Sequence, residues 1–474
     1  MKEEGIRKTG KKVRNPLIKR ILRELAGDWR KYLVVSLFMI LTIGFVSGMY
    51  VANESMRKAV DKSRSENKLE SGHFELSRRA EEALFSALLS EEAAVPVRLY
   101  ENFYRNEEED HDNDGAADGT IRVYAKTEEI NLACLIEGSV PETEEEIAID
   151  RMHADNVGVV VGDTITVGGQ SFRVVGLIAY VNYSSLHEKS TDIVFDALKF
   201  DVAMVTERGF DRLSRSVHYV YAWQYAEEPA DEKEEKKRSD DFLKALLAQT
   251  IAGGNKLEDY IPRYANPAIN FAPDDMGSDE AMGGVLLYIL IVIIAFIFAV
   301  TISSTIAGEA QVIGTLRASG YSRGELTRHY LSMPVIVTLA AAVIGNILGY
   351  TVFKNVVVSM YYNSYSLPTY QTIWNPEAFI RTTLVPAALM LVVNFAVISK
   401  MLRHTPLQFL RHDLKKTKRK RAVRLPGLGF FGRFRLRIML QNIPNYFILL
   451  AGIFFIMVML AMAVGMPDTL RFYK

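Results

Sequence analysis

Several groups of residues in this 474-residue sequence have side chains and spacing that could support chemistry. The segment Asp110-His111-Asp112-Asn113-Asp114-Gly115 matches the first half of an EF-hand loop, in which alternate oxygen ligands bind calcium and a glycine occupies the sixth place. The twelfth position is Ile121, where a calcium loop needs a bidentate Glu. The segment is therefore either a calcium site or an acidic hairpin tip.

A second segment, Gly320-Tyr321-Ser322-Arg323-Gly324, matches the G-x-S-x-G pattern of a nucleophile elbow. That elbow requires a strand before it and a helix after it, whereas here the segment follows a predicted connector helix. His73, His111, His153 and His187 lack paired spacing with one another or with Glu. We therefore expect no catalytic residue, no metal, no cofactor and no enzyme activity.

The segment with the strongest functional signal, Gly308 to Gly320, lies between two long apolar runs. At helical spacing Val312, Ile313 and Leu316 form a small apolar face, with a charged residue at each end and two glycines that allow close approach or a helix stop. This arrangement predicts a short helix that docks onto a partner. The predicted docking residues are Glu309, Ile313, Gly314, Leu316, Arg317 and Gly320.

Five uncharged runs are long enough to cross a bilayer as helices, which needs about 20 apolar residues. They are residues 32–52, 282–307, 330–353, 382–399 and 443–466. The average composition conceals them, because 24% charged residues, 49% hydrophobic residues and zero net charge are typical of a soluble protein. The sequence predicts an α-helical membrane protein with about five transmembrane helices.

Basic residues predict the orientation, because short cytoplasmic segments carry excess Lys and Arg. Lys and Arg precede the first run, occur in the 308–329 connector and are dense in 400–442, whereas Asn355 to Ile380 has none. We therefore expect the N-terminus inside, and the 53–281 domain and the 354–381 loop outside. Anionic lipid explains the basic 400–442 segment, so we expect no nucleic-acid partner.

The cytoplasmic N-terminus, residues 1–31, ends in an amphipathic stretch. Residues 16–31 place on one helical face Ile18, Ile21, Leu22, Leu25 and Trp29. This pattern predicts either an elbow helix in the inner membrane interface or plain basic flanking of the first membrane helix.

The stretch 53–281 is too long for a structureless loop, so we predict a folded α+β domain. Strands are expected at 121–126, 146–149, 164–167 and 171–178. Gly168-Gly169 should form a two-residue hairpin turn. The edges, 53–70 and 240–251, are expected to be helices that stand up from the membrane as stalks. The charged segment 227–241 is expected to be an exposed loop.

Two glycine pairs in the apolar runs, Gly44-x-x-x-Gly48 and Gly345-x-x-x-Gly349, allow close helix approach, either within one subunit or between two. Asn346 and Asn394 lie deep in these runs, and each should find a partner in the bundle. No chain of ionisable residues lines the runs, which argues against a proton-driven transporter and against a hydrophilic pore.

The Gly308–Gly320 segment resembles the connector between the second and third membrane helices of FtsX/MacB-type ABC transporter permeases. The family pattern of a Glu, an Ile-Gly pair, a Leu-Arg and a small-x-Gly is matched by Glu309, Ile313-Gly314, Leu316-Arg317 and Ala318-Ser319-Gly320. Thr405 to Arg411 resembles the family's short tail, and residues 137–165 contain matches to its extracytoplasmic domain. The resemblance implies that the connector is a coupling helix in a groove of an ATPase subunit.

By this resemblance, the chain is a permease subunit in a bacterial plasma membrane. It would couple ATP hydrolysis by a separate ABC ATPase to motion of the exterior domain, for export or release of peptide or lipoprotein-like substrates. The sequence contains no P-loop motif, which also places the ATPase on another polypeptide. The alternative is a non-transporting transmitter that activates an extracytoplasmic enzyme such as a cell-wall hydrolase.

The residues from Arg433 onward echo residues 17–50, where a basic amphipathic stretch and an aromatic residue also lead into a membrane helix. This echo predicts the beginning of a second copy. Long members of the family carry two copies around two exterior domains. We therefore expect the chain to lack most of a second repeat and to work with a second permease copy or a complementary half.

Overall fold

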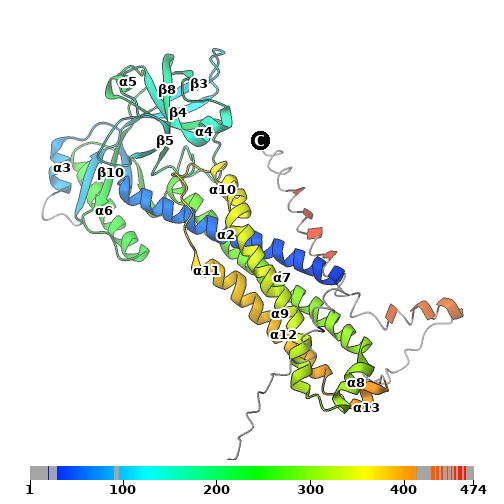
Figure 1. Ribbon diagram of the computed structural model, residues 1–474. Helices are drawn as coiled ribbons and strands as arrows, with labels where there is room; N and C mark the ends of the chain where they lie inside the picture. Colours follow the sequence, from blue (N-terminus) through cyan, green and yellow to red (C-terminus); the bar gives the residue numbers. More distant parts are fainter. Residues whose placement is uncertain are drawn as a thin grey trace, which may run out of the picture. The chain divides into compact units, whose positions relative to one another are not determined.

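A computed structural model of the chain describes residues 29–89 and 95–411, together with Arg20, Asp413 and scattered residues between 429 and 465. The chain divides into two units, Met1–His412 and Asp413–Lys474. Most of the predicted elbow at 16–31 and most of the fifth apolar run at 443–466 lie outside the described residues. The elements below all belong to the first unit (Figure 1).

Four helices in the described part of the chain are long and apolar enough to cross a membrane. The first two are α2 (Trp29–Glu66) and α7 (Pro267–Gly308). The third comprises α9 (Arg323–Leu348), a π-helical turn (Gly349–Phe353) and α10 (Lys354–Tyr362). The fourth comprises α11 (Pro376–Phe379), a π-helical turn (Ile380–Leu384) and α12 (Val385–Met401). The predicted fold class, a helical membrane protein with an α+β domain, is confirmed.

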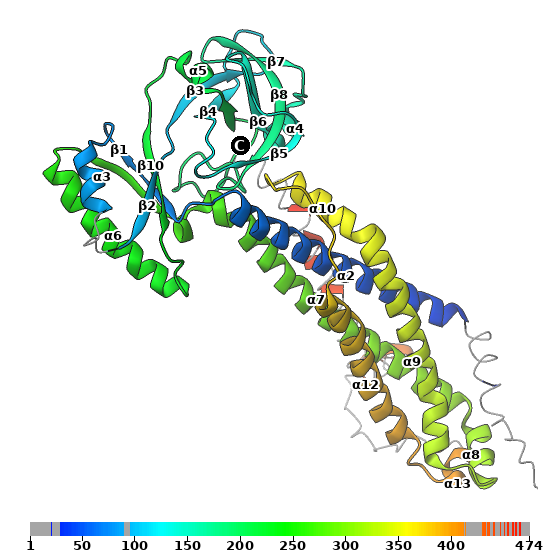
Figure 2. The same cartoon turned by 60° about the vertical axis from the view of Figure 1, so that its left-hand side comes forward.

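The first two membrane helices are much longer than a bilayer requires. Helix α2 has 38 residues and α7 has 42. At 1.5 Å per residue, 38 residues span roughly 57 Å, whereas the hydrocarbon core of a bilayer is about 30 Å thick. Part of each helix therefore projects beyond the membrane as a stalk, and Figure 2 shows α2, α7 and α10 running side by side to the β-rich domain.

The two predicted glycine motifs face each other within this one chain, at the crossing of α2 and α9. A Cβ atom added at Gly349 would lie 3.0 Å from the Gly44 carbonyl oxygen, and one added at Gly48 would lie 2.8 Å from the Lys354 nitrogen. Small residues let the two backbones approach closely, as is usual for helix pairs in membranes. Of the two predicted alternatives, the glycine motifs therefore serve helix packing within one subunit.

Replacing Gly48 with Val is expected to destabilise the bundle by about 1–3 kcal/mol, because the new side chain would overlap backbone atoms that cannot move aside cheaply. Thermal unfolding of the detergent-solubilised protein measures the change. Gly277→Val is the control, because a Cβ at Gly277 in α7 meets no atom within 4 Å. Equal losses in both variants would contradict the close crossing.

The two membrane asparagines differ in their partners. Asn346 Oδ1 accepts hydrogen bonds from Ser47 Oγ at 2.8 Å and Thr382 Oγ1 at 3.0 Å, and its amide donates to Thr383 Oγ1 at 3.0 Å. The amide thus joins three helices, as predicted. Asn394 only donates to the carbonyl of Met390 in its own helix, and its Oδ1 has no partner among the described residues.

The β-rich domain, called the β domain below (residues 67–266), contains two sheets. The smaller sheet has the order β11-β1-β10-β2 and is antiparallel. Its strands are β1 (Gly72–Leu76), β2 (Val97–Glu101), β10 (Tyr219–Tyr225) and β11 (Leu257–Pro262). Helices α3 (Glu82–Leu88) and α6 (Glu232–Ala252) supply Leu84 and Phe242 to a core that includes Phe74 and Trp223.

The larger sheet has seven strands in the order β5-β8-β6-β9-β4-β3-β7, and β7 also pairs with β8, so the sheet closes on itself. Its strands are β3 (Tyr104–Asp110), β4 (Gly119–Ala125), β5 (Ala133–Gly138), β6 (Glu146–Asp150), β7 (Thr164–Val167), β8 (Gln170–Tyr180) and β9 (Phe200–Val205). The short helices α4 (Arg151–Val157) and α5 (Glu207–Asp211) flank it. The predicted strands are confirmed, and Gly168 and Gly169 form the β7–β8 turn with φ of +57° and +74°.

Two predictions about α6 were wrong. The 240–251 segment is helical but is not a stalk, because strand β11 separates it from the next membrane helix. The buried residues of α6 pack on the smaller sheet. The second stalk is the beginning of α7. The charged 227–241 segment is not all loop, since Asp231 caps α6 and pairs such as Lys236–Glu232 at 2.6 Å stabilise its first turns.

Candidate functional site

The predicted connector is a helix, α8 (Ala310–Ala318), between α7 and α9. Gly320 follows it with φ of +103°, a left-handed conformation that favours glycine. Ser322 then starts α9 with a capping box, since its hydroxyl accepts from the Glu325 N–H and Glu325 bonds back to Ser322. The sequence therefore fixes both ends of a tight helix-turn-helix.

The inner face of α8 packs on α13 (Pro406–Leu410), a short helix after α12 (Figure 1). Ile313 is fully buried. A Cβ atom added at Gly314 would lie 2.8 Å from Leu410 Cγ and 3.1 Å from the Leu410 nitrogen. Only glycine allows this approach. Ile313 and Gly314 therefore hold α8 against α13, and Ile313, predicted as part of the apolar docking face, is buried inside the chain.

The two charged residues of the connector are also engaged within the chain. Glu309 Oε1 lies 2.6 Å from Arg20 Nη2, and Glu309 Oε2 accepts a 2.6 Å hydrogen bond from the Tyr330 hydroxyl. Arg317 donates to the carbonyls of Leu402 and His404 at the end of α12. Partial burial lowers the pKa of Arg317, and Arg323 lowers it further. These contacts position α8 relative to α9 and the end of α12.

The exposed side of the α8–α13 pair is apolar, and basic residues adjoin it in the chain. Val312 is 43% exposed, Leu407 55% and Leu410 42%, and Leu316 is partly buried. We call these four side chains the connector surface. Exposed arginines occur in the adjoining parts of the chain, namely Arg323 and Arg328 at the start of α9 and Arg403 and Arg411 on either side of α13. Sequence reasoning found Val312 and Leu316 through their spacing on α8, but α13 adds Leu407 and Leu410, which only the packing of two distant segments brings together.

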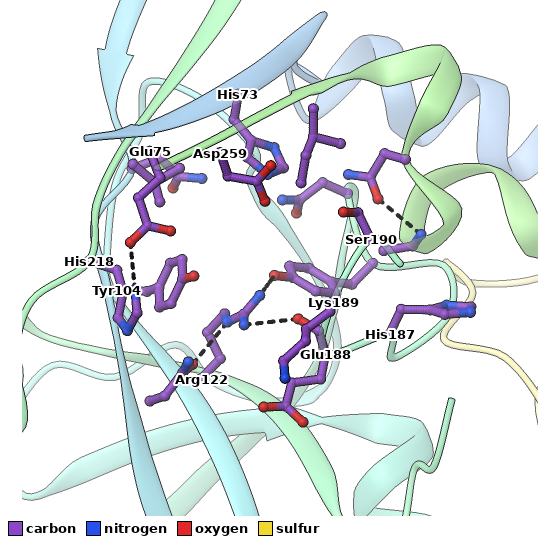
Figure 3. Close-up of a pocket in the computed structure, with 18 of the residues that line it drawn as sticks. His73, Glu75, Tyr104, Arg122, His187, Glu188, Lys189, Ser190, His218 and Asp259 are labelled. Atoms are coloured by element: carbon purple, nitrogen blue, oxygen red, sulfur yellow. Dashed lines mark hydrogen bonds and ion pairs between the residues drawn. The ribbon is translucent and has the colours of Figure 1, made fainter. Parts of the chain in front are cut away.

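A cavity of about 220 Å³ lies in the β domain between the two sheets (Figure 3). Strand β4 contributes Arg122, which is 8% exposed. Its guanidinium donates to Asn106 Oδ1 at 3.0 Å, the Tyr183 hydroxyl at 2.8 Å and the Glu188 carbonyl at 3.0 Å, and it stacks over Tyr104. Within the described residues no carboxylate forms an ion pair with it. Arg122 is thus a buried cation with two N–H groups to spare.

The opposite wall of the cavity is acidic and contains two histidine–carboxylate pairs. His73 lies 2.6 Å from Glu70, and His218 lies 2.7 Å from Glu75. Burial alone would lower the pKa of His73, but Glu70 raises it above its ordinary value. The exposed Asp259 completes this wall. The cavity suits a small polar ligand that carries an anionic group toward Arg122.

The base of the β domain is bonded to the loop that follows α10. Ser366 Oγ donates to Asp150 Oδ2, and Arg151 Nη2 donates to the Tyr365 carbonyl at 2.7 Å. We call these four residues the tether. Burial raises the pKa of Asp150, although Ser366 and Arg151 oppose that shift. The tether joins the β6–α4 junction to the third membrane helix.

Two tyrosines of this helix and loop also bond to α7. The Tyr361 hydroxyl donates to Asp279 Oδ2 at 2.7 Å, and the Tyr365 hydroxyl donates to Asp275 Oδ2 at 2.8 Å. From the β domain, Ser184 Oγ donates to the carbonyl of Ala268 at 2.8 Å, near the start of α7. Displacement of the stalk helices would therefore reach the β domain by two sets of hydrogen bonds, one through the tether and one through Ser184 at the start of α7.

The hairpin between β3 and β4 holds the EF-hand-like segment. Asp110 and Asp112 accept hydrogen bonds from the backbone of Asp114 and Gly115, so their oxygens already close the turn. The segment is thus an acidic hairpin tip, in which Asp110, Asp112 and Asp118 also bring one oxygen each within 4.8 Å of the others. The same hairpin brings His111 close to His153 and Glu109, which the spacing in the sequence could not indicate.

Comparison with known proteins gives one family match. Residues 284–406 match the family FtsX-like permease C-terminal, a segment that runs from α7 through α8, α9 and α12 to Pro406. A comparison with curated proteins gives no match.

Two solved structures are similar to part of the chain. The extracellular domain of the noncanonic ABC-type transporter YknZ from Gram-positive bacteria is 10% identical, with a TM-score of 0.23, and the match covers 40% of this chain and 100% of that one. The periplasmic region of MacB from Actinobacillus actinomycetemcomitans is 10% identical, with a TM-score of 0.24, and the match covers 43% of this chain and 94% of that one.

Proposed function

We propose, from the match of residues 284–406 to the FtsX-like permease C-terminal family, that the chain is the membrane subunit of an ABC transporter whose ATPase is a separate polypeptide. The observation that carries the proposal is the connector surface. Exposed aliphatic side chains on two short, rigidly packed helices, with arginines in the adjoining parts of the chain, suit an apolar groove with acidic edges on a protein partner. In this proposal that partner is the ATPase.

The connector is built to transmit motion rather than to absorb it. Glu309 and Arg317 fix α8 to α9 and to the end of α12. A push on the connector surface therefore moves the membrane helices themselves. At the other end of these helices the tether and the Tyr361–Asp279 contact carry the displacement into the β domain. We infer that ATP-driven motion of α8 and α13 is relayed to the β domain.

Export of a peptide or lipoprotein and activation of an extracytoplasmic enzyme would both use this relay. The core of the described bundle is mainly apolar, with residues such as Ile43, Ile291, Phe298 and Met390 buried together, and the polar groups around Asn346 bond to one another, which favours a transmitter over an aqueous conduit. Release of a labelled substrate from vesicles separates the two functions, since a pure transmitter releases none while ATP hydrolysis continues.

The β domain is expected to face the exterior and the connector the cytoplasm. In a Cys134→Ser background, Asp114→Cys at the hairpin tip should react with a membrane-impermeant thiol reagent in intact cells, because Asp114 is exposed. Ser322→Cys, also exposed, should react only after the membrane is opened. Labelling in the reverse order would overturn the proposed orientation and the ATPase contact together.

A further inference from the structure

Three potential metal ligands from separate elements meet at one edge of the larger sheet. Glu109 lies near the end of β3, His111 begins the hairpin after it, and His153 lies in α4. One ligand atom from each lies within 4.8 Å of the others. His153 Nε2 is 3.2 Å from Glu109 Oε1. The side chains of Glu109 and His153 are fully buried, whereas that of His111 is 20% exposed.

The contacts of His153 show which of its nitrogens faces the cluster. Nδ1 lies 2.8 Å from the Ala197 carbonyl oxygen, which can only accept, so Nδ1 carries the proton. Backbone carbonyls orient metal-ligating histidines in this way. Nε2 faces Glu109 Oε1 at 3.2 Å, a contact that either a proton on Nε2 or a metal ion between the two atoms would satisfy.

Two buried carboxylate oxygens at this place also lack partners. Within the described residues neither Glu109 Oε2 nor Asp201 Oδ2 receives a hydrogen bond, although both side chains are completely buried. Asp201 is close enough to act electrostatically on His153. A buried carboxylate without compensation is costly. A proton on Nε2 would satisfy one contact but would leave Glu109 Oε2 without a partner among the described residues. His111 Nδ1 lies 3.0 Å from Asp118 Oδ2, so this imidazole is held beside the cluster by a carboxylate.

We propose that Glu109, His111 and His153 bind a divalent transition metal ion, with Zn²⁺ as the best fit. Two imidazole nitrogens and one carboxylate oxygen are donors that zinc prefers. Donor atoms about 2.0–2.1 Å from zinc lie roughly 3.3 Å apart in a tetrahedron, which agrees with the 3.2 Å between His153 Nε2 and Glu109 Oε1. Partial exposure of His111 leaves a route for the ion to enter.

The ion would join the hairpin to α4, whose first residues belong to the tether. His153 lies two residues after Arg151, and Asp150 caps the same helix by accepting from the Met152 N–H at 2.8 Å. A metal at this point would fix α4 against β3 and stiffen the base of the β domain. The inference does not depend on ATPase coupling, since it concerns the β domain alone.

The test uses the purified full chain in detergent, stripped of metal and then titrated with Zn²⁺ or Co²⁺. We expect one ion per chain by elemental analysis, a Co²⁺ visible spectrum typical of a low-coordinate site, and a higher unfolding temperature with Zn²⁺. His111→Ala should weaken the affinity by at least about 10-fold, while the metal-free unfolding temperature stays close to that of the wild type.

His73→Ala is the matched control, because the His73 side chain is also 20% exposed and pairs with the buried Glu70, but it lies away from the cluster. This variant should bind Zn²⁺ as the wild type does. Glu109→Gln provides a second variant and should also weaken binding. Sub-stoichiometric binding, or equal affinity in the wild type and in His111→Ala, would mean an adventitious ion only and would overturn the proposal.

Discussion

Replacing Val312 and Leu407 together with Glu is expected to abolish stable association with the ATPase, with a loss of at least about 10-fold in copurified ATPase. Each carboxylate would be forced into an apolar interface, where an unpaired charge costs several kcal/mol, and each 1.4 kcal/mol corresponds to a tenfold change in affinity. ATP hydrolysis that depends on the permease should disappear with the association. Both side chains are exposed, so the chain itself should still fold.

The control for this variant is Ile251→Glu. Ile251 is 74% exposed on α6, a helix of the β domain, which lies at the other end of the membrane helices from α8 and α13 (Figure 1). It should copurify with the ATPase as the wild type does. If Val312→Glu, Leu407→Glu still associates and still stimulates ATP hydrolysis, the connector surface is not the ATPase contact.

The second large effect is expected from the tether. In Arg151→Ala, Ser366→Ala, the two side-chain hydrogen bonds of the tether are removed, including the 2.7 Å bond to the Tyr365 carbonyl, whereas the backbone bond from the Ser366 N–H to the Ser184 carbonyl remains. Association with the ATPase and its hydrolysis rate should remain, because α8 and α13 are untouched. The output of the β domain, whether substrate release or enzyme activation, should fall by at least about 10-fold, since loss of one buried hydrogen bond to a charged group is worth about 1.5–3 kcal/mol.

Arg79→Ala is the matched control for the tether variant. Arg79 forms a 2.8 Å ion pair with Glu101 on the surface of the β domain and has no contact with the membrane helices among its recorded partners. Its removal should leave the output unchanged, since exposed ion pairs contribute little. Equal output from the tether variant and the wild type would show that the relay follows another route.

The elements that position the site could be predicted wherever a local pattern determines them. The apolar runs predicted the four described membrane helices, and the β-prone segment 164–167 predicted strand β7. Gly168-Gly169 predicted the turn between β7 and β8. Helix α8 followed from apolar spacing and from Gly320, whose left-handed backbone ends the connector. Each of these features depends on residues that are neighbours in the sequence.

Features that depend on residues far apart in the sequence could not be predicted. Ile313 has the same character as Val312, and only the position of α13 decides that Ile313 is buried and Val312 exposed. The pairing of Glu309 with Tyr330 needs the turn between α8 and α9. His111 and His153 are brought together by β3 and α4, so spacing alone gave no reason to connect them.

The wrong prediction that residues 240–251 form a stalk helix has a similar cause. The 240–251 segment is a good amphipathic helix, and such a helix can pack on any apolar face. The smaller sheet offers Phe74 and Trp223, which bury Phe242 and Leu246 of α6. The sequence places this helix close to the membrane run, but β11 intervenes and the chain returns to the sheet before α7 begins.

The most direct test of the account is photo-crosslinking from the connector surface in living cells. A benzophenone amino acid placed at Val312 or at Leu407 should give a crosslinked product whose second component, identified by mass spectrometry, is an ABC ATPase. The same amino acid at Ile251 should give none. If no ATPase is crosslinked from either connector position, while the protein is folded in the membrane and the ATPase is present, the proposed coupling through α8 and α13 is contradicted.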